Sequence, residues 1–194
     1  MKYLLVCSVG LAGILLHLLP PSQSTSYEII GDERTMNFIC DDQDNRGNVP
    51  LRKILDTSGL HFVVADDMET LYYTGDVKML DNLVRGPITM EADVYRWQRS
   101  QWLPTGLSLR RDNFCEALKN PREIWYPVLK KIGINMNYCP PKKGTSYTLT
   151  NVSNHVFVKN MPFADVAGDL KAVVHFGNGG RKTCVVIYFK VYTH

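Results

Sequence analysis

The sequence predicts a mainly β protein, a two-sheet β sandwich or cup with a short helical connector. Three observations predict this fold class: several short strand-like segments, a glycine-rich hairpin near the C-terminus, and one amphipathic segment between two cysteines. Many short strands separated by turn residues are typical of a sandwich. No internal repeat or linker divides the chain, so we expect residues 27–194 to form a single domain.

The N-terminus has the pattern of a secretory signal peptide in residues 1–26. Lys2 precedes an apolar run of about 17 residues, and the small residues that follow offer a cleavage site near Ser24 or Ser26. An uncleaved membrane anchor is the alternative. His17 and two glycines interrupt the run, however, which is marginal for spanning a bilayer. We therefore expect a secreted, extracellular protein.

Alternating or apolar runs bounded by turn residues predict the strands. In residues 88–95 apolar and polar side chains alternate cleanly, as in a half-buried strand. The predicted strands are LHFVVADD (60–67), ETLYYTGDVKML (69–80), ITMEADVYRW (88–97), SYTLTNVS (146–153), DLKAVVHF (169–176) and RKTCVVIYFKVYTH (181–194).

Residues 177–180, GNGG, predict a hairpin between the last two strands. On the last strand, alternate residues from Val185 to Val191 form a regular apolar face, and Cys184 begins a mixed opposite face. A strand that is apolar on both sides suits a sandwich interior or a cavity wall. If the Cys184 face points inward, the regular face needs a cover from sheet pairing or from a partner.

Residues 112–132 break the β pattern and predict a bent, amphipathic connector. Asp112 is expected to cap a short helix that runs through Lys119. Asn120 is expected to cap a second helix, with Pro121 at its first position and Glu123 completing an arrangement close to a capping box.

A second proline bends this connector. Pro127 should end or kink the second helix, because proline removes a backbone donor and crowds the preceding turn. Ile124, Val128 and Ile132 share one helical face, with Trp125 and Leu129 beside them.

Once the signal peptide and Cys7 are removed, four cysteines remain: Cys40, Cys115, Cys139 and Cys184. An even number in a secreted chain predicts two disulfides, for which three connectivities are open. A zinc site is the alternative, but it normally uses close CxxC pairs, and the sequence has none. We therefore predict no metal and no cofactor.

Charge is distributed unevenly along the chain. Residues 27–95 carry 14 acidic and 6 basic side chains, whereas residues 96–143 carry 3 acidic and 10 basic side chains. The two regions could neutralise each other in the fold, or they could form a basic face for anionic headgroups or an acidic partner. A nucleic-acid partner is not predicted for a secreted domain with so small a net charge.

No catalytic motif is present: GxSxG, HExxH and a glycine-rich phosphate loop are all missing. The DQDNRG segment (42–47) fails as an EF-hand, because Arg46 replaces a ligand and Lys53 stands at the twelfth position. Asp66 and Asp67 would face opposite ways on a strand. We therefore predict that the protein is not an enzyme.

Asn151 begins a glycosylation sequon, which places that segment on the surface if it is used.

The cysteine arrangement resembles a known superfamily. An early Cys40, a helical stretch between Cys115 and Cys139, and a last strand with Cys184 resemble the ML lipid-recognition superfamily, nearest its ganglioside-activator-like branch. Over roughly residues 27–194 the chain is similar to the insect chemosensory proteins of the CheA and CheB groups, small secreted proteins associated with pheromone-sensing bristles. The motifs NFCEALKN and YCPPKKGTSY are the most specific part of this resemblance.

The resemblance implies a single ML-like lipid-binding domain that holds an apolar molecule between its sheets. It also implies the disulfides Cys40–Cys184 and Cys115–Cys139. The implied function is non-enzymatic binding of a lipid, hydrocarbon or pheromone in chemosensation, with a sensory receptor or a membrane surface as further candidate partners.

In this interpretation, the connector lies at the rim of the cup, and its lysines and arginines meet the polar end of the ligand. Trp97, Trp102, Leu103 and Phe163 join the candidates because they are expected in or beside loops. The predicted ligand-binding residues are Trp97, Trp102, Leu103, Ile124, Trp125, Val128 and Phe163.

Three alternatives stay open. The core could be filled, with incidental exposed aromatic residues. The protein could be an accessory module that binds a receptor ectodomain without a lipid. It could also be a lipid hydrolase, although the sequence offers no nucleophile for one.

Overall fold

A computed structural model of the protein describes residues 26–37, 40, 47–84, 86–135, 137–159 and 166–193. Two predictions fall outside these residues, namely the signal peptide up to residue 25 and the ligand contact at Phe163. No helix in the described part of the chain has the length and hydropathy needed to cross a membrane.

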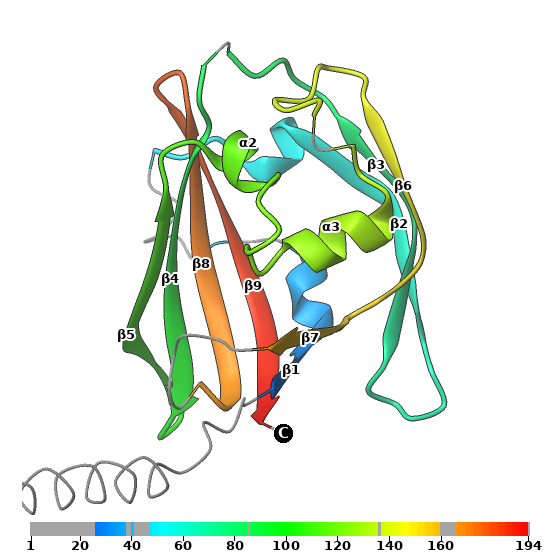
Figure 1. Cartoon of the computed structure of the whole chain (residues 1–194), viewed down its shortest axis with the longest axis vertical. Coiled ribbons are helices and arrows are strands. Elements are labelled where there is room, and N and C mark those ends of the chain that lie inside the picture. Colours follow the sequence, from blue (N-terminus) through cyan, green and yellow to red (C-terminus); the bar gives the residue numbers. More distant parts are fainter. Residues whose placement is uncertain are drawn as a thin grey trace, which may run out of the picture.

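The described strands form two antiparallel sheets that stand apart, with helices between them (Figure 1). The larger sheet has six strands in the order β5-β4-β8-β9-β1-β7, and the smaller has three in the order β2-β3-β6. This arrangement confirms the predicted β sandwich or cup. The strands are β1 Ser26–Gly31, β2 Leu55–Val64, β3 Leu71–Met79, β4 Thr89–Gln98, β5 Gln101–Arg111, β6 Ser146–Ser153, β7 His155–Lys159, β8 Gly168–Asn178 and β9 Arg181–Thr193.

Strand β9 shows which face of the larger sheet points inward. Val185 packs with Val174 of β8 and Met90 of β4, and it also lines a cavity shared with the smaller sheet. The regular apolar face is therefore the inner one. The face that carries Cys184 is covered by the chain itself, because Cys40 packs there against Cys184 and strand residues of the same cluster.

Asn154 joins the two sheets. Strands β6 and β7 are consecutive in the chain, yet β6 pairs with β3 in the smaller sheet and β7 pairs with β1 in the larger. At the corner between them, the buried Asn154 side chain accepts a hydrogen bond from Leu71 N (2.9 Å) and donates to the carbonyl oxygen of Gly31 (2.7 Å). These bonds fasten the start of β3 to the end of β1, and Figure 1 shows β1 and β7 at the end of the larger sheet away from helix α2.

Two tight turns set the hairpins of the larger sheet. Gly179 and Gly180 both adopt positive φ between β8 and β9, as a two-residue hairpin turn requires. Arg99 and Ser100 do the same between β4 and β5 without glycine. Because this turn contains no glycine, the sequence analysis did not predict β5 and placed Trp102 and Leu103 in or beside a loop. They lie on that edge strand, whose outer position tolerates Pro104.

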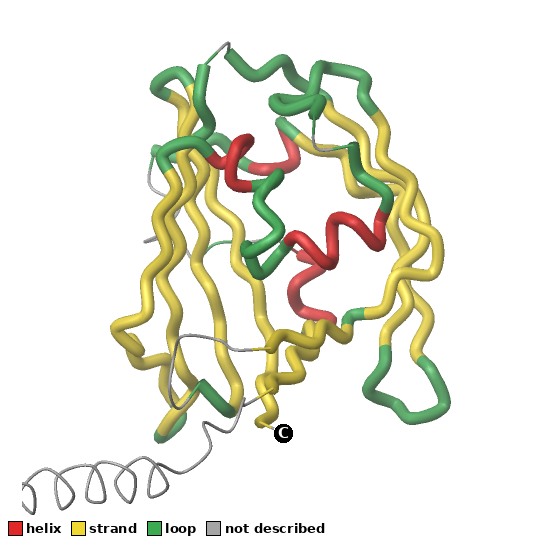
Figure 2. The backbone as a smooth tube through the Cα atoms, viewed as in Figure 1, coloured by secondary structure: helices red, strands yellow, loops and turns green. Residues whose placement is uncertain are grey.

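The connector contains two short helices, α2 Phe114–Ala117 and α3 Tyr126–Ile132, which lie between the sheets (Figure 2). The predicted caps were wrong. The Asn113 side chain, not that of Asp112, caps α2 by accepting a hydrogen bond from Glu116 N, whereas Asn120 heads a turn and not a helix.

Pro127 lies in the first turn of α3 and does not end a helix. A helix leaves the amide groups of its first turn unpaired, so proline loses no hydrogen bond there, and its fixed φ suits the first helical positions. Two 3₁₀ helices, Glu33–Asn37 and Leu51–Lys53, complete the described helical structure.

Both predicted disulfides are present. Cys40 is bonded to Cys184, and Cys115 to Cys139. The first joins residues 144 positions apart and fixes the early chain to β9, while the second closes a separation of 24 positions around the connector.

Candidate ligand-binding cavity

A cavity of about 440 Å³ lies between the two sheets beneath the connector. Its volume falls within the roughly 300–1,000 Å³ of small-molecule sites. Both sheets contribute to its wall, Val77 and Met79 from β3 and Phe176 and Val185 from β8 and β9. Most of the lining side chains are apolar, so the space suits a hydrocarbon chain better than a charged molecule.

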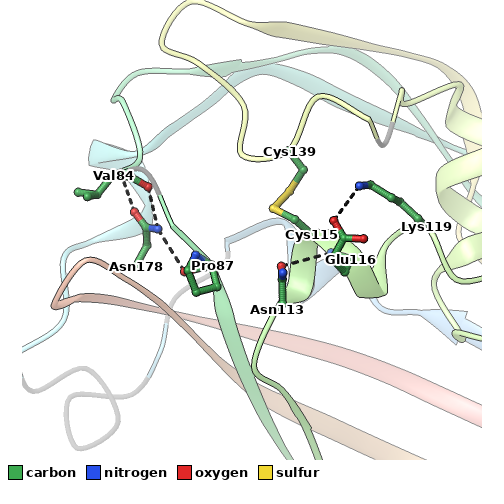
Figure 3. Close-up of a disulfide and its surroundings, with 8 residues drawn as sticks. All are labelled: Val84, Pro87, Asn113, Cys115, Glu116, Lys119, Cys139 and Asn178. Atoms are coloured by element: carbon green, nitrogen blue, oxygen red, sulfur yellow. Dashed lines mark hydrogen bonds and ion pairs between the residues drawn. A yellow bond between two sulfur atoms is a disulfide. The ribbon is translucent and has the colours of Figure 1, made fainter.

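The connector closes one side of this cavity. Phe114 and Leu118 line it from α2 and the following turn, and Leu129 lines it from α3. Cys139 is itself a lining residue, and its bond to Cys115 holds the loop after α3 against α2 (Figure 3). The helical segment between the two cysteines therefore forms part of the wall, as the rim hypothesis proposed, although with different side chains.

The loop between β3 and β4 is fastened to the β8–β9 hairpin beside the cavity. The Asn178 side chain accepts a hydrogen bond from Val84 N (2.7 Å) and donates to the carbonyl oxygens of Val84 (3.1 Å) and Pro87 (3.4 Å) (Figure 3). Arg181 forms an ion pair with Asp81 of the same loop at 2.7 Å. The loop is therefore held by the two residues that flank the hairpin turn.

Two of the polar residues that line the cavity, Asn178 and Arg181, are already paired with the β3–β4 loop. The hydrogen bond from Arg181 lowers the pKa of the Asp81 carboxyl, so this pair stays ionised. Burial raises the pKa of the lining Tyr147 hydroxyl, which stays neutral. Arg181 and Lys182 are the basic lining residues. Among the described residues of the connector, no lysine or arginine lines the cavity. Their contact with the polar end of a ligand stays a prediction.

None of the six described residues predicted to bind ligand lines this cavity. Trp97 and Trp102 are in ring contact at 5.1 Å, and Trp102 also lies 5.8 Å from Tyr188 on the outer face of the larger sheet. Lys171 stacks over Trp102 there. Leu103 is half-buried on the edge strand β5. Their role in ligand binding stays a prediction.

The three candidates on the connector also lie outside the cavity wall. Ile124 is 44% exposed, and Val128 is half-buried on α3. Trp125 packs into the core cluster around Met90 and Val185, with its ring 5.3 Å from that of Phe114. Trp125 therefore supports the lining residue Phe114 from behind.

We expect Trp125→Ala to lower the free energy of unfolding by roughly 3 kcal/mol, the lower end for removing a core tryptophan. Ligand affinity should fall less, because the indole lies behind the wall. Urea unfolding and ligand titration of the same variant measure both effects. A large loss of affinity at unchanged stability would instead make Trp125 a ligand contact.

The sequence analysis missed lining residues in three parts of the chain, for a different reason in each. Met79 and Val77 lie on a predicted strand whose inner face was not assigned. Leu129 was placed beside the predicted connector face and was not chosen. Leu51 precedes a strand in a segment with no periodicity. The alternation of β3 was the one usable signal, since residues 77 and 79 share a face.

A hydroxyl, an imidazole and a carboxylate form a hydrogen-bonded row where the residue before β3 meets strands β7 and β1 of the larger sheet. His155 Nε2 lies 3.2 Å from Thr70 Oγ1, and His155 Nδ1 lies 2.7 Å from Glu28 Oε1. In a catalytic triad the imidazole accepts the proton of the hydroxyl. Here Thr70 donates its hydrogen bond to Asp67 Oδ2 at 2.5 Å, and Thr70 does not line the cavity. We interpret this network as a structural fastening of the β2–β3 turn.

The pKa of Asp67 predicts how the stability contributed by this hydrogen-bond network changes at acidic pH. Hydrogen bonds from the Thr70 hydroxyl and from the amides of Thr70 and Glu69 lower its pKa from 3.8 to about 2. Its stabilising contribution is therefore complete above pH 3.8 and is lost as the pH falls through about 2. We expect Asp67→Asn to be less stable than wild type at neutral pH and equally stable near pH 2.

Urea unfolding at a series of pH values measures this difference. Asp66→Asn is the matched control, because it makes the same substitution at the preceding residue. A gap between wild type and Asp67→Asn that is constant with pH would contradict the assignment.

Among the described residues, no group of His, Cys, Asp or Glu side chains could hold a metal ion. Asn151, the predicted glycosylation site, is exposed on β6. Its φ of 52° is a left-handed conformation that asparagine tolerates better than most residues. The sequon is therefore accessible, and its use stays a prediction.

Comparison with models of known protein families finds no match, and comparison with curated proteins finds no similar sequence. The resemblance to the insect chemosensory proteins therefore rests on the sequence motifs alone.

Proposed function

We propose that the protein is a secreted, non-enzymatic binding protein for an apolar ligand, such as a lipid, a hydrocarbon or a pheromone. One observation carries this proposal: an apolar cavity of about 440 Å³ between the two sheets. Cavities of this size with a few polar groups are typical of small-molecule sites. A filled sandwich core would leave no such space.

Two further features support the proposal. The disulfides suit an oxidising extracellular environment. The disulfide around the connector also fixes part of the cavity wall, which a carrier needs in order to keep its site formed while empty. The sensory role, a response to pheromone, follows from the family resemblance and is proposed on that basis.

Native mass spectrometry of the secreted protein, purified without reducing agent, tests the proposal. A stoichiometric adduct that organic extraction releases and identifies as a lipid or hydrocarbon would support it. An empty protein that stays empty when offered fatty acids and cuticular hydrocarbons would contradict it.

The second candidate function is binding of a receptor ectodomain as a protein partner, and exposed apolar residues favour it. Val63 and Met68, at the β2–β3 turn, are 62% and 82% exposed. Large apolar side chains gathered at one exposed place are frequent at protein-binding sites. A pull-down of the receptor by protein stripped of all lipid would favour this candidate over the carrier.

A further inference from the structure

Thr183 places a buried hydroxyl in the wall of the mostly apolar cavity. The residue is the third of β9 after the hairpin turn, and it is 7% exposed. It lines the cavity together with Phe176, its cross-strand partner on β8. Its Oγ1 atom is buried and has no hydrogen-bond partner among the described residues.

Such a hydroxyl lowers the stability of the protein without ligand, because a buried polar group that has lost its water and gained no hydrogen bond raises the free energy of the folded state. Valine has the same shape and would fit this strand position without that penalty. The neighbouring Val185 and Val186 show that β9 accepts valine on both faces. An unsatisfied polar group in a native structure therefore calls for an explanation.

The hydroxyl can be turned toward a bound molecule. Rotation about the Cα–Cβ bond exchanges the threonine methyl and hydroxyl groups between staggered positions. A ligand atom that accepts or donates a hydrogen bond would draw the hydroxyl toward the cavity, and the free energy lost by its burial would be recovered on binding.

The surroundings select an uncharged partner group. The hydrogen-bonding groups of Asn178 are used by the β3–β4 loop, and Arg181 is paired with Asp81. Lys182, the other basic lining residue, is exposed and lies on the face of β9 opposite Thr183, because adjacent strand residues point to opposite faces. A carboxylate carried to Thr183 would therefore be buried without a cation beside it, which is strongly unfavourable. An alcohol, a carbonyl or an ester needs no counter-charge.

We propose that Thr183 is a specificity-determining contact, and that the cavity takes a long apolar chain bearing one uncharged oxygen function in preference to a plain hydrocarbon or a fatty-acid anion. This inference rests on the proposed carrier function. It adds the chemical class of the ligand to it.

Displacement of a fluorescent naphthylamine probe tests the inference. The competitors are dodecane, dodecanol and dodecanoate, and the proteins are wild type, Thr183→Val and Thr183→Ser. The readout is the change between proteins in the preference for dodecanol over dodecane, because this comparison cancels differences in solubility between the two compounds. We expect Thr183→Val to reduce this preference about fivefold, which corresponds to one uncharged hydrogen bond. Thr183→Ser should retain the preference, since it keeps the hydroxyl.

Two results would overturn the inference and leave the carrier function in place. One is an unchanged preference for dodecanol in Thr183→Val. The other is tighter binding of dodecanoate than of dodecanol by the wild type. If no competitor and no probe binds, the carrier function itself fails, and the inference falls with it.

The melting temperature of the empty protein gives an independent readout. Thr183→Val should raise it, because the variant loses an unsatisfied hydroxyl and keeps its volume. A lower melting temperature would show that the hydroxyl already has a partner in the protein, and it would overturn the inference.

Discussion

Replacing Val77 with tryptophan should lower the affinity for an apolar ligand about tenfold or more. Val77 lies on β3 and lines the cavity opposite the larger sheet. An indole at this position would occupy space that the ligand needs. Losing about 60 Å² of apolar burial costs about 1.5 kcal/mol, which is close to tenfold in affinity.

The stability of the Val77→Trp variant should change little or increase, because filling a cavity adds apolar contacts. Lys78→Trp is the matched control. It adds the same side chain to the next residue of β3, which is exposed and does not line the cavity. Ligand titration and urea unfolding of both variants separate the two effects.

The outcomes are distinct. If Val77→Trp loses affinity and Lys78→Trp keeps it, the ligand lies between the sheets. If both variants keep full affinity, the ligand binds elsewhere, and the aromatic cluster around Trp97 and Trp102 becomes the first place to examine.

The second large effect concerns the disulfides. Removing Cys40–Cys184 by alanine substitution should lower the free energy of unfolding by about 5 kcal/mol, and removing Cys115–Cys139 by about 3 kcal/mol, because the first closes the longer loop in the unfolded chain. The two bonds span 144 and 24 positions. Total stabilities are typically about 5–15 kcal/mol, so the first variant is expected to be only marginally folded.

The two variants should also differ in function. The Cys115–Cys139 bond holds the wall of the cavity, so its removal should weaken ligand binding even where the protein remains folded. Urea midpoints, measured with ligand titration under conditions where each variant is folded, check both statements. Equal losses of stability would show that the unfolded chain does not behave as the loop model assumes.

The sequence by itself determined the strands with a regular pattern. The alternation of residues 88–95 became β4 with its apolar side buried, and the glycines before β9 became a tight turn. Local rules are sufficient for these elements, because pleat and turn geometry act over a few residues. The even number of cysteines also predicted two disulfides, but their pairing came only from the resemblance.

Local rules failed where two interpretations were both physically sound. Pro127 can end one helix or begin the next, and only the packing of α3 between the sheets selected the second. The turn before β5 contains no glycine, and the strand itself contains a proline, so its sequence pattern alone resembled a loop. Pairing with β4 supplied the hydrogen bonds that made it a strand.

The tertiary structure alone decided the site. The wall combines Val77 from the smaller sheet, Leu129 from the connector and Thr183 from the larger sheet, residues more than 50 positions apart in the chain. The predicted tryptophans lie outside that wall. Exposure and hydrophobicity suggested them, but which side chains share a cavity depends on how two sheets and a connector are placed, and that placement is set by long-range contacts that local patterns do not encode.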